Sequence, residues 1–321
     1  MSTKKKSRIH IDGDKLVLIA AIIVVFALFT CLNKNFLSVT NMINILIAAS
    51  LVGMVAVGHT YLIIAGQNDL SPGSLAAFSG VVAALLGSKG MPFAAAVIVT
   101  IVCGAAVGFF NAFMVNKIHL EAFIATLVTQ SIIRGFAYII CGGKPVSISN
   151  KTFLLLGKAR ILNIPVSVWI MIICIVVFGI ILAKTKFGRS VYAIGGSMDA
   201  ARLAGLNPKK IITTCYVMMG ILCSIGGICY CLNTMSGNVQ QALGLEMDAI
   251  ASSVIGGTLL TGGVGNVIGS FFGVLINGTI STLVKTNGKL LSSWSNIAVA
   301  ALLCFFIVLQ SIFAKIKEKS K

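Results

Sequence analysis

Long apolar runs alternate with short polar stretches along the whole chain. Most of the runs reach about 20 residues, the length that an α-helix needs to cross the hydrocarbon core of a bilayer. They lie at about 16–32, 41–66, 72–88, 92–116, 120–141, 165–183, 211–232, 247–260, 264–285 and 293–314. The pattern predicts a single all-α transmembrane domain over 1–321, a polytopic membrane protein with about ten transmembrane helices.

Two stretches rich in glycine or proline interrupt this pattern without forming a long polar loop. One reads GQNDLSPGS at 66–74, the other reads GGTLLTGGVG at 256–265, and each borders a short apolar run. Irregular backbone at membrane depth is tolerated only where protein or a water-filled cavity satisfies its polar groups, and it often belongs to a transport path. We therefore expect broken or short helices near 66–74 and 256–265.

Lysine and arginine residues divide unequally between the two sides that the runs define. With the N-terminus in the cytoplasm, sixteen of the 25 basic residues fall on the cytoplasmic side and eight on the outer side, and Arg134 lies within a run. By the positive-inside rule, both termini are then cytoplasmic. The tails 1–15 and 315–321 and the polar segment 184–210 share that side. This clustering accounts for the net charge of +17, so we expect a lipid environment and no nucleic-acid partner.

The sequence lacks the motifs of ATP hydrolysis and of common metal sites. No G-x-x-x-x-G-K-[ST] loop is present, the nine cysteines include no C-x-x-C pair, and the three histidines are scattered. We therefore expect no catalytic residues, no metal and no cofactor in this chain, which is not predicted to be an enzyme.

Polar side chains in or beside the apolar runs are candidates for lining a transport path, because they are costly in a membrane. They are Asn68, Asp69, Ser71, Thr126, Gln130, Arg134, Glu246 and Asp248. Thr126, Gln130 and Arg134 recur at i, i+4 and i+8, on one helix face. That face either borders water or forms interhelical bonds that only stabilise packing. Ser71 also suits the N-cap of a helix that starts at Pro72, and the two late acids suit a helix N-terminus.

Small residues recur at the spacing of close helix–helix contacts. Gly104 and Gly108 form one G-x-x-x-G pair, and Gly265, Gly269 and Gly273 form a double one. Such residues let two backbones approach closely inside a membrane, so we expect helix packing at both places.

The polar stretch YAIGGSMDAARLAGLNPKK at 192–210 contains the start and stop signals of a short helix. Ser197 suits the N-cap, Asp199 and Arg202 can pair at i, i+3, and Gly205 suits a left-handed C-cap. About two turns of helix are unstable alone. The helix therefore either docks its small apolar face into a groove on a partner or lies on the membrane surface.

Four sequence blocks resemble those of one family of membrane proteins. They read DLSPGS at 69–74, AFIATL at 122–127 with Arg134 and Gly135 after it, GRSVYAIGGSMDAARLAGLNPKK from Gly188, and LEMDAIASSVIGGTLLTGGVG at 245–265. In this order they resemble the ribose-type permease subunits of ATP-binding-cassette (ABC) transporters, the inner membrane components of binding-protein-dependent monosaccharide uptake systems. The resemblance covers nearly the whole chain.

The resemblance implies a multi-pass permease of the bacterial cytoplasmic (inner) membrane that forms the translocation pathway for a ribose-like pentose or related sugar. Implied partners are a second permease subunit, identical or paralogous, a cytoplasmic sugar-import ATPase that binds ATP and Mg, and an extracytoplasmic sugar-binding protein. Segment 184–210 would be the coupling segment. Its implied contacts with the ATPase are Gly195, Gly196, Ser197, Asp199, Ala200, Ala201, Arg202, Leu203, Ala204 and Gly205.

Some positions depart from the family pattern, and they bear on the substrate more than on the family. Ser197 replaces an asparagine, Pro72 a valine and Glu121 a proline, while Gln67 and Asn68 replace a glycine–isoleucine-like approach to the first break. Two alternatives stay open. One is an ABC permease for a nucleoside or a branched-chain amino acid, and the other is an ion-coupled secondary transporter.

Overall fold

The computed structural model describes residues 37–286, 294, 297–301 and 303–308, and helices dominate this part of the chain. The helices are α2 (Val39–Ile64), α3 (Pro72–Ser88), α4 (Phe93–Asn116), α5 (Ala122–Cys141), α6 (Lys151–Lys158), α7 (Val166–Lys184), α8 (Lys186–Gly196), α9 (Met198–Leu203), α10 (Pro208–Thr234), α11 (Leu245–Ile255) and α12 (Val267–Thr286). Two antiparallel pairs of two-residue strands join β1 (Val146–Ser147) to β4 (Ser236–Gly237), and β2 (Arg160–Ile161) to β3 (Ile164–Pro165). The prediction of an all-α polytopic membrane protein is confirmed.

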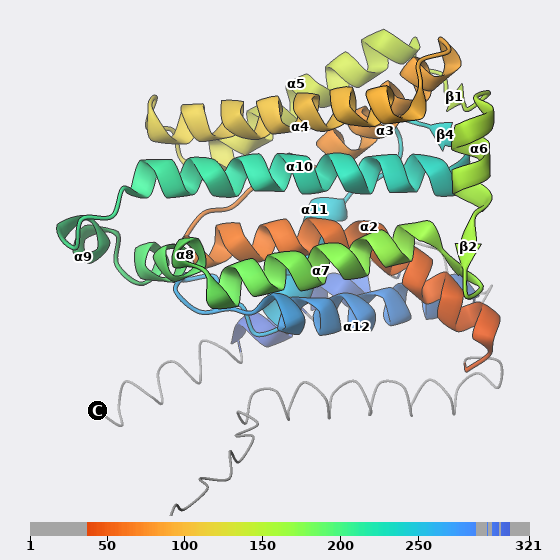
Figure 1. Ribbon diagram of the computed structural model, residues 1–321. Helices are drawn as coiled ribbons and strands as arrows, with labels where there is room; N and C mark the ends of the chain where they lie inside the picture. The colour runs from red at the N-terminus through yellow and green to blue at the C-terminus, as the bar shows by residue number, and fades with distance from the viewer. Residues whose placement is uncertain (1–36, 287–293, 295–296, 302, 309–321) are drawn as a thin grey trace, which may run out of the picture.

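The long helices run side by side along one direction (Figure 1). Among the described residues, α2, α4, α5, α7 and α10 are long and apolar enough to cross a membrane. Shorter apolar helices are α3, the part of α12 up to Thr282, and one over 297–308. The predicted run at 16–32 lies outside the described residues.

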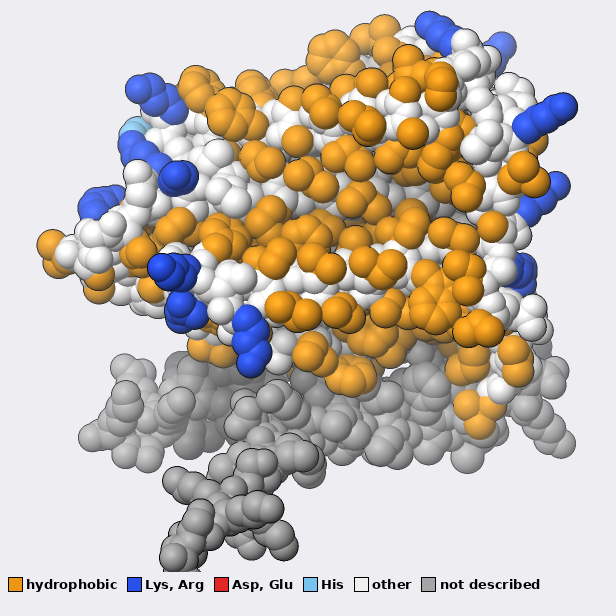
Figure 2. All heavy atoms as spheres, viewed as in Figure 1, with side chains coloured by type: hydrophobic (Ala, Val, Ile, Leu, Met, Phe, Trp, Pro, Cys, Tyr) orange, Lys and Arg blue, Asp and Glu red, His pale blue; other side chains and the backbone are white. Residues whose placement is uncertain are grey.

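The two ends of the bundle differ in structure. One end carries α8 and the protruding α9 and is called the α9 end here; the other carries α6 and the short strands and is called the α6 end (Figure 1). Figure 2 shows a broad apolar band over the helices in view, with lysine and arginine side chains gathered at both ends. This distribution matches a bilayer whose hydrocarbon core surrounds the middle of the bundle.

Helices α2 and α10 form the centre of the bundle and are its most buried long helices. The α4–α10 contact depends on small residues, because a Cβ at Gly220 would collide with the carbonyl oxygen of Gly104. A Cβ at Gly108 would likewise collide with the carbonyl oxygen of Tyr216. The G-x-x-x-G prediction is confirmed here. It is confirmed again between α11 and α12, where Gly269 packs on the carbonyl of Gly256.

Both predicted interruptions are present. Residues 65–71 are non-helical between α2 and α3, and residues 256–266 are non-helical between α11 and α12. At 1.5 Å per residue, α3 is about 26 Å long and α11 about 17 Å, so α11 covers only about half of a bilayer. The run at 247–260 is therefore a half-helix that ends at the α9 end, while α3 ends at the α6 end.

Two helices outside the apolar runs were not predicted. Helix α6 begins after Asn150, whose side chain accepts a hydrogen bond from the Thr152 N–H at 2.9 Å, and it buries Phe153 edge-on against Phe93. Helix α8 begins after Thr185, whose side chain accepts from the Gly188 N–H at 3.1 Å. Both are capped and amphipathic, so neither contains a long apolar run that would have predicted it.

Candidate functional site

The N-terminal ends of α3 and α11 meet inside the bundle. Gly73, in the first turn of α3, faces Glu246, in the first turn of α11. A Cβ at Gly73 would collide with Oε2 of Glu246 and lie 2.5 Å from the carbonyl oxygen of Ala242. We call this meeting point the crossing. Two positive helix ends oppose each other there, so the buried carboxylate of Glu246 has a favourable place between them.

The first break is held in shape by a second buried carboxylate. Oδ1 of Asp69 accepts from the Ser71 N–H at 2.8 Å and from the Ser71 hydroxyl at 2.7 Å, and Nδ2 of Asn111 donates to that hydroxyl oxygen at 3.0 Å. Pro72 begins the helix as predicted. The N-cap prediction for Ser71 is only half right, because Ser71 occupies the position but its side chain bonds Asp69 and makes no cap bond.

Two further contacts fix the backbone of the first break. The Leu70 N–H donates to Oγ1 of Thr126 at 3.0 Å, and the Tyr216 hydroxyl donates to the carbonyl oxygen of Asn68 at 3.0 Å. Sequence reasoning missed Asn111 and Tyr216. Asn111 is a polar residue in an apolar run, which is the same signal that selected the other candidates, whereas nothing in the sequence links Tyr216 to the break.

Thr126, Gln130 and Arg134 form a polar stripe on α5. This stripe connects the two broken elements, which are α2 and α3 with the first break between them, and α11 and α12 with loop 256–266 between them. Thr126 bonds the first break, and Nε2 of Gln130 donates to Oε1 of Glu246 at 3.3 Å. Arg134 donates through Nε to the Ser74 hydroxyl at 2.9 Å and through Nη1 to the Val239 carbonyl at 2.6 Å. The shared face of these three residues therefore turns toward protein, and their interhelical bonds fasten α3 and α11 to α5.

Asp248 lies beside the crossing, and its backbone carbonyl bonds a side chain of α12. It is half-buried in the first turn of α11, where its carbonyl oxygen accepts from Nδ2 of Asn277 at 3.2 Å. The structure thus brings seven of the eight candidates into one network around the crossing and the first break. The Asp248 carbonyl accepts from Asn277 of α12 and from the Ser252 hydroxyl within α11.

Several buried polar atoms near the crossing form no hydrogen bond with any described residue. They include Oδ1 of Asn111, Nη2 of Arg134 and Oε2 of Glu246. A buried polar group without a partner costs about 1–3 kcal/mol, so each is a free donor or acceptor for a polar ligand. Among the described residues, no three His, Cys, Asp or Glu side chains gather as metal ligands would.

The predicted short helix in segment 184–210 is present as α9. Oγ of Ser197 accepts from the Ala200 N–H at 3.2 Å, and Gly205 is left-handed with φ +83°. Asp199 and Arg202 form an exposed ion pair at 3.9 Å. Its apolar residues Leu203 and Ala200 are exposed, and Leu203 is 89% exposed, whereas Ala201 is buried against the bundle.

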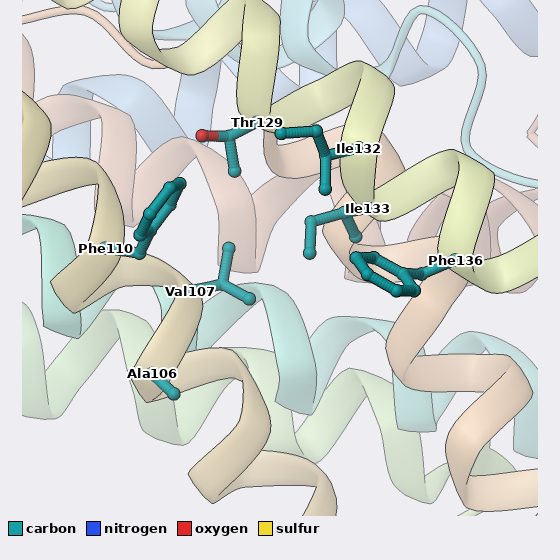
Figure 3. A pocket seen from close by; sticks show the side chains of 7 residues that line it. All are labelled: Ala106, Val107, Phe110, Thr129, Ile132, Ile133 and Phe136. Carbon is teal, nitrogen blue, oxygen red and sulfur yellow. The ribbon is translucent and has the colours of Figure 1, made fainter.

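Two hollows lie on the surface near these elements. An apolar groove of about 300 Å³ lies between α4 and α5, with Phe110, Ile132 and Phe136 among the side chains around it (Figure 3). A polar pocket of about 220 Å³ opens at the α9 end, lined in part by Gln67 and Glu121. Two of the departures from the family pattern, far apart in sequence, therefore share one pocket at the start of the first break.

A bundle of long apolar helices, interrupted by two short helices whose polar ends meet inside it, is the architecture of a membrane transport protein. The family model described as "Branched-chain amino acid transport system / permease component" matches residues 41–309, and the chain belongs to that family.

Curated relatives cover most of the chain. The inner membrane ABC transporter permease protein YjfF of Escherichia coli is 37% identical over 87% of each chain. The ribose import permease protein RbsC of E. coli is 36% identical over 90% of this chain and 91% of its own. The L-arabinose transport system permease protein AraH of E. coli is 34% identical over 98% of this chain and 93% of its own. No solved structure matches the chain. The resemblance to ribose-type permeases is confirmed.

Proposed function

We propose that this chain is the permease subunit of an ABC importer and forms the translocation pathway for a monosaccharide, a ribose-like pentose or a related sugar. The observation that carries the proposal is the similarity to permeases named for ribose and L-arabinose, which extends over 90% and 98% of the chain. It includes both breaks and segment 184–210, the parts that differ most from a simple helix bundle.

The crossing supports a neutral, hydroxyl-rich solute. The free atoms of Arg134, Glu246 and Asn111 offer both donors and acceptors, and sugar hydroxyls can do both in return. Arg134 also carries a charge opposite to that of Glu246 and lies close enough to interact with it. In this proposal Asn68, Asp69, Ser71, Thr126, Gln130, Arg134, Glu246 and Asp248 line or shape the pathway.

The energy for transport would come from other subunits. The sequence has no phosphate-binding loop, so ATP and Mg²⁺ would be held by a cytoplasmic ATPase, and this chain itself would not be an enzyme. A second permease subunit, identical or paralogous, would complete the pathway in the inner membrane, and an extracytoplasmic binding protein would deliver the sugar. Both termini would face the cytoplasm, as the basic residues indicate.

Helix α9 has the exposure that contact with an ATPase requires. It protrudes from one end of the bundle (Figure 1), its capping residues belong to segment 184–210 itself, and its Leu203 is available for contact with a partner. In this proposal Gly195, Gly196, Ser197, Asp199, Ala200, Ala201, Arg202, Leu203, Ala204 and Gly205 form the coupling region, with the buried Ala201 supporting it from within.

Uptake by the source cells tests the function directly. Cells lacking this chain should lose high-affinity uptake of radiolabelled D-ribose or L-arabinose, and restoring the chain should recover it. Uptake should fall when arsenate depletes ATP and persist when an ionophore collapses ion gradients, which separates an ABC importer from an ion-coupled carrier. Unchanged uptake of both sugars, with loss of leucine or nucleoside uptake, would replace the sugar by that solute.

A further inference from the structure

Helix α8 forms a tight backbone junction with both broken elements. A Cβ at Gly195 would collide with the carbonyl oxygen of Ile64, the last residue of α2, and would lie 2.6 Å from the amide nitrogen of Gly263. The same Gly263 N–H donates to the Ile64 carbonyl at 2.8 Å. Three chain segments therefore meet around one carbonyl, and only a glycine on α8 lets them approach this closely.

A side-chain bond reinforces the junction one turn earlier on α8. The Tyr192 hydroxyl donates to the carbonyl oxygen of Gly265 at 2.7 Å. Burial raises the pKa of the Tyr192 phenol, so the hydroxyl stays protonated and remains a donor. Tyr192 and Gly195 thus fix α8 to the loop 256–266 at two points.

The two segments held at this junction lead to the crossing. Ile64 is followed by the first break and the N-terminal end of α3, where Gly73 meets Glu246. Loop 256–266 follows directly on α11, and the other end of that helix carries Glu246. Each broken element is therefore attached to α8 at the α9 end and contacts the other inside the bundle.

Helix α8 is joined to α9 through a single residue, Ser197, whose backbone is extended. The Ser197 N–H donates to the Ala193 carbonyl of α8 at 3.1 Å, and the Ser197 side chain caps α9. The one-residue link and its bonds provide a direct path by which a displacement of α9 can reach α8, and α8 contacts both broken elements.

We propose that Tyr192 and Gly195 are positioning residues that couple movement of α8 and α9 to the relative position of α3 and α11 at the crossing. This inference rests on the proposed function for its driving partner, the ATPase. The junction would make a single cytoplasmic movement act on α3 and α11 together, so that the crossing opens or closes as a unit.

The test uses the purified complex with its own ATPase in proteoliposomes. Tyr192→Phe removes one hydroxyl, and we expect uptake per ATP hydrolysed to fall about fivefold, the factor that one net hydrogen bond contributes. Gly195→Ala forces the junction apart and should lower the same ratio further. Tyr192 lies outside the proposed ATPase contact, so Tyr192→Phe should keep the bound ATPase, and the amount of bound ATPase is measured for both variants. The matched controls are Tyr230→Phe, near the α6 end of α10, and Gly179→Ala, where a Cβ meets its nearest neighbour at 3.8 Å.

A conformational readout separates this inference from the choice of substrate. Leu260 is exposed in loop 256–266, and in a cysteine-free background a single cysteine placed there can be labelled with a maleimide. With the intact junction, adding a non-hydrolysable ATP analogue should change the labelling rate; with Tyr192→Phe or Gly195→Ala the change should disappear. If the labelling rate in both variants still responds to nucleotide as in the wild type, the inference about the junction is wrong, even where sugar uptake fails. If the wild type shows the nucleotide response but takes up neither sugar, only the proposed substrate is wrong.

Discussion

Arg134 joins three separate segments at the crossing. Its guanidinium bonds the Ser74 hydroxyl in α3 and the Val239 carbonyl in the segment before α11. It also lies near enough to Glu246 for their charges to interact. Arg134 reaches these acceptors through two different nitrogens, and a lysine has only one donor nitrogen and no planar fork with which to reproduce that geometry.

Arg134→Ala should therefore lower uptake at least about tenfold, because hydrogen bonds from a charged group contribute about 1.5–3 kcal/mol each. Arg134→Lys should recover part of the loss. Uptake, the amount of chain in the membrane and ATP hydrolysis are measured together. Ser131→Ala is the matched control, since Ser131 is exposed on the same helix and bonds only within it, to Leu127.

Normal membrane levels with defective uptake would indicate a pathway role for the stripe. Loss of the protein from the membrane would indicate that the bonds of Arg134 serve packing. Wild-type uptake in Arg134→Ala would contradict both roles.

At the scale of elements, α9 has its own capping interactions and an exposed surface. Its N-cap, ion pair and left-handed C-terminal residue are all local, yet six residues of helix have little stability alone. The buried Ala201 holds one side against the bundle, and the other side is free for a partner.

Ala200→Asp should reduce co-purification of the ATPase, because it places a carboxylate and extra volume on the exposed face. Gly205→Val should also reduce co-purification, because a β-branched residue resists φ +83° and would distort the end of α9. Gly205→Asn is the matched control, since asparagine tolerates that conformation. If Ala200→Asp and Gly205→Val both retain the ATPase and normal uptake, α9 is not the contact.

The sequence predicted those elements whose signals are local. Caps, Gly-Pro interruptions and apolar runs predicted α9, both breaks and the long helices. It did not predict which polar groups would meet, because Gln130 and Glu246 are 116 positions apart and their spacing in sequence carries no information about their contact. The junction at Gly195 was missed for the same reason, since its three segments come together only through the packing of α2, α8 and α12.

At the scale of the whole molecule, the bundle has two chemically similar ends and an apolar middle, so the side that each end faces is set by the balance of basic residues. Ser190, on α8, is partly exposed, and Lys151, at the start of α6, is exposed at the opposite end. The orientation is therefore open to a direct labelling test.

In a cysteine-free background, single cysteines at Ser190 and Lys319 should resist a membrane-impermeant thiol reagent in intact cells, and a cysteine at Lys151 should react. The reason is that the distribution of basic residues predicts a cytoplasmic α9 end. Lys319 lies outside the described residues. Permeabilised cells, in which every accessible site should react, provide the control. Labelling of position 190 from outside would reverse the orientation and remove the basis for an ATPase contact at α9.

During synthesis, α3 leaves the ribosome long before α10, the helix on which it packs. The α3–α10 contact is close, since a Cβ at Gly227 would collide with the Ala76 carbonyl and the hydroxyls of Ser79 and Ser224 lie 3.1 Å apart. Helix α11, with 11 residues and two acids in its first turn, is too short and too polar to enter lipid by itself. Helix α3 therefore reaches its final place only after later parts of the chain have been translated, and membrane insertion and folding are separate events in time for this protein.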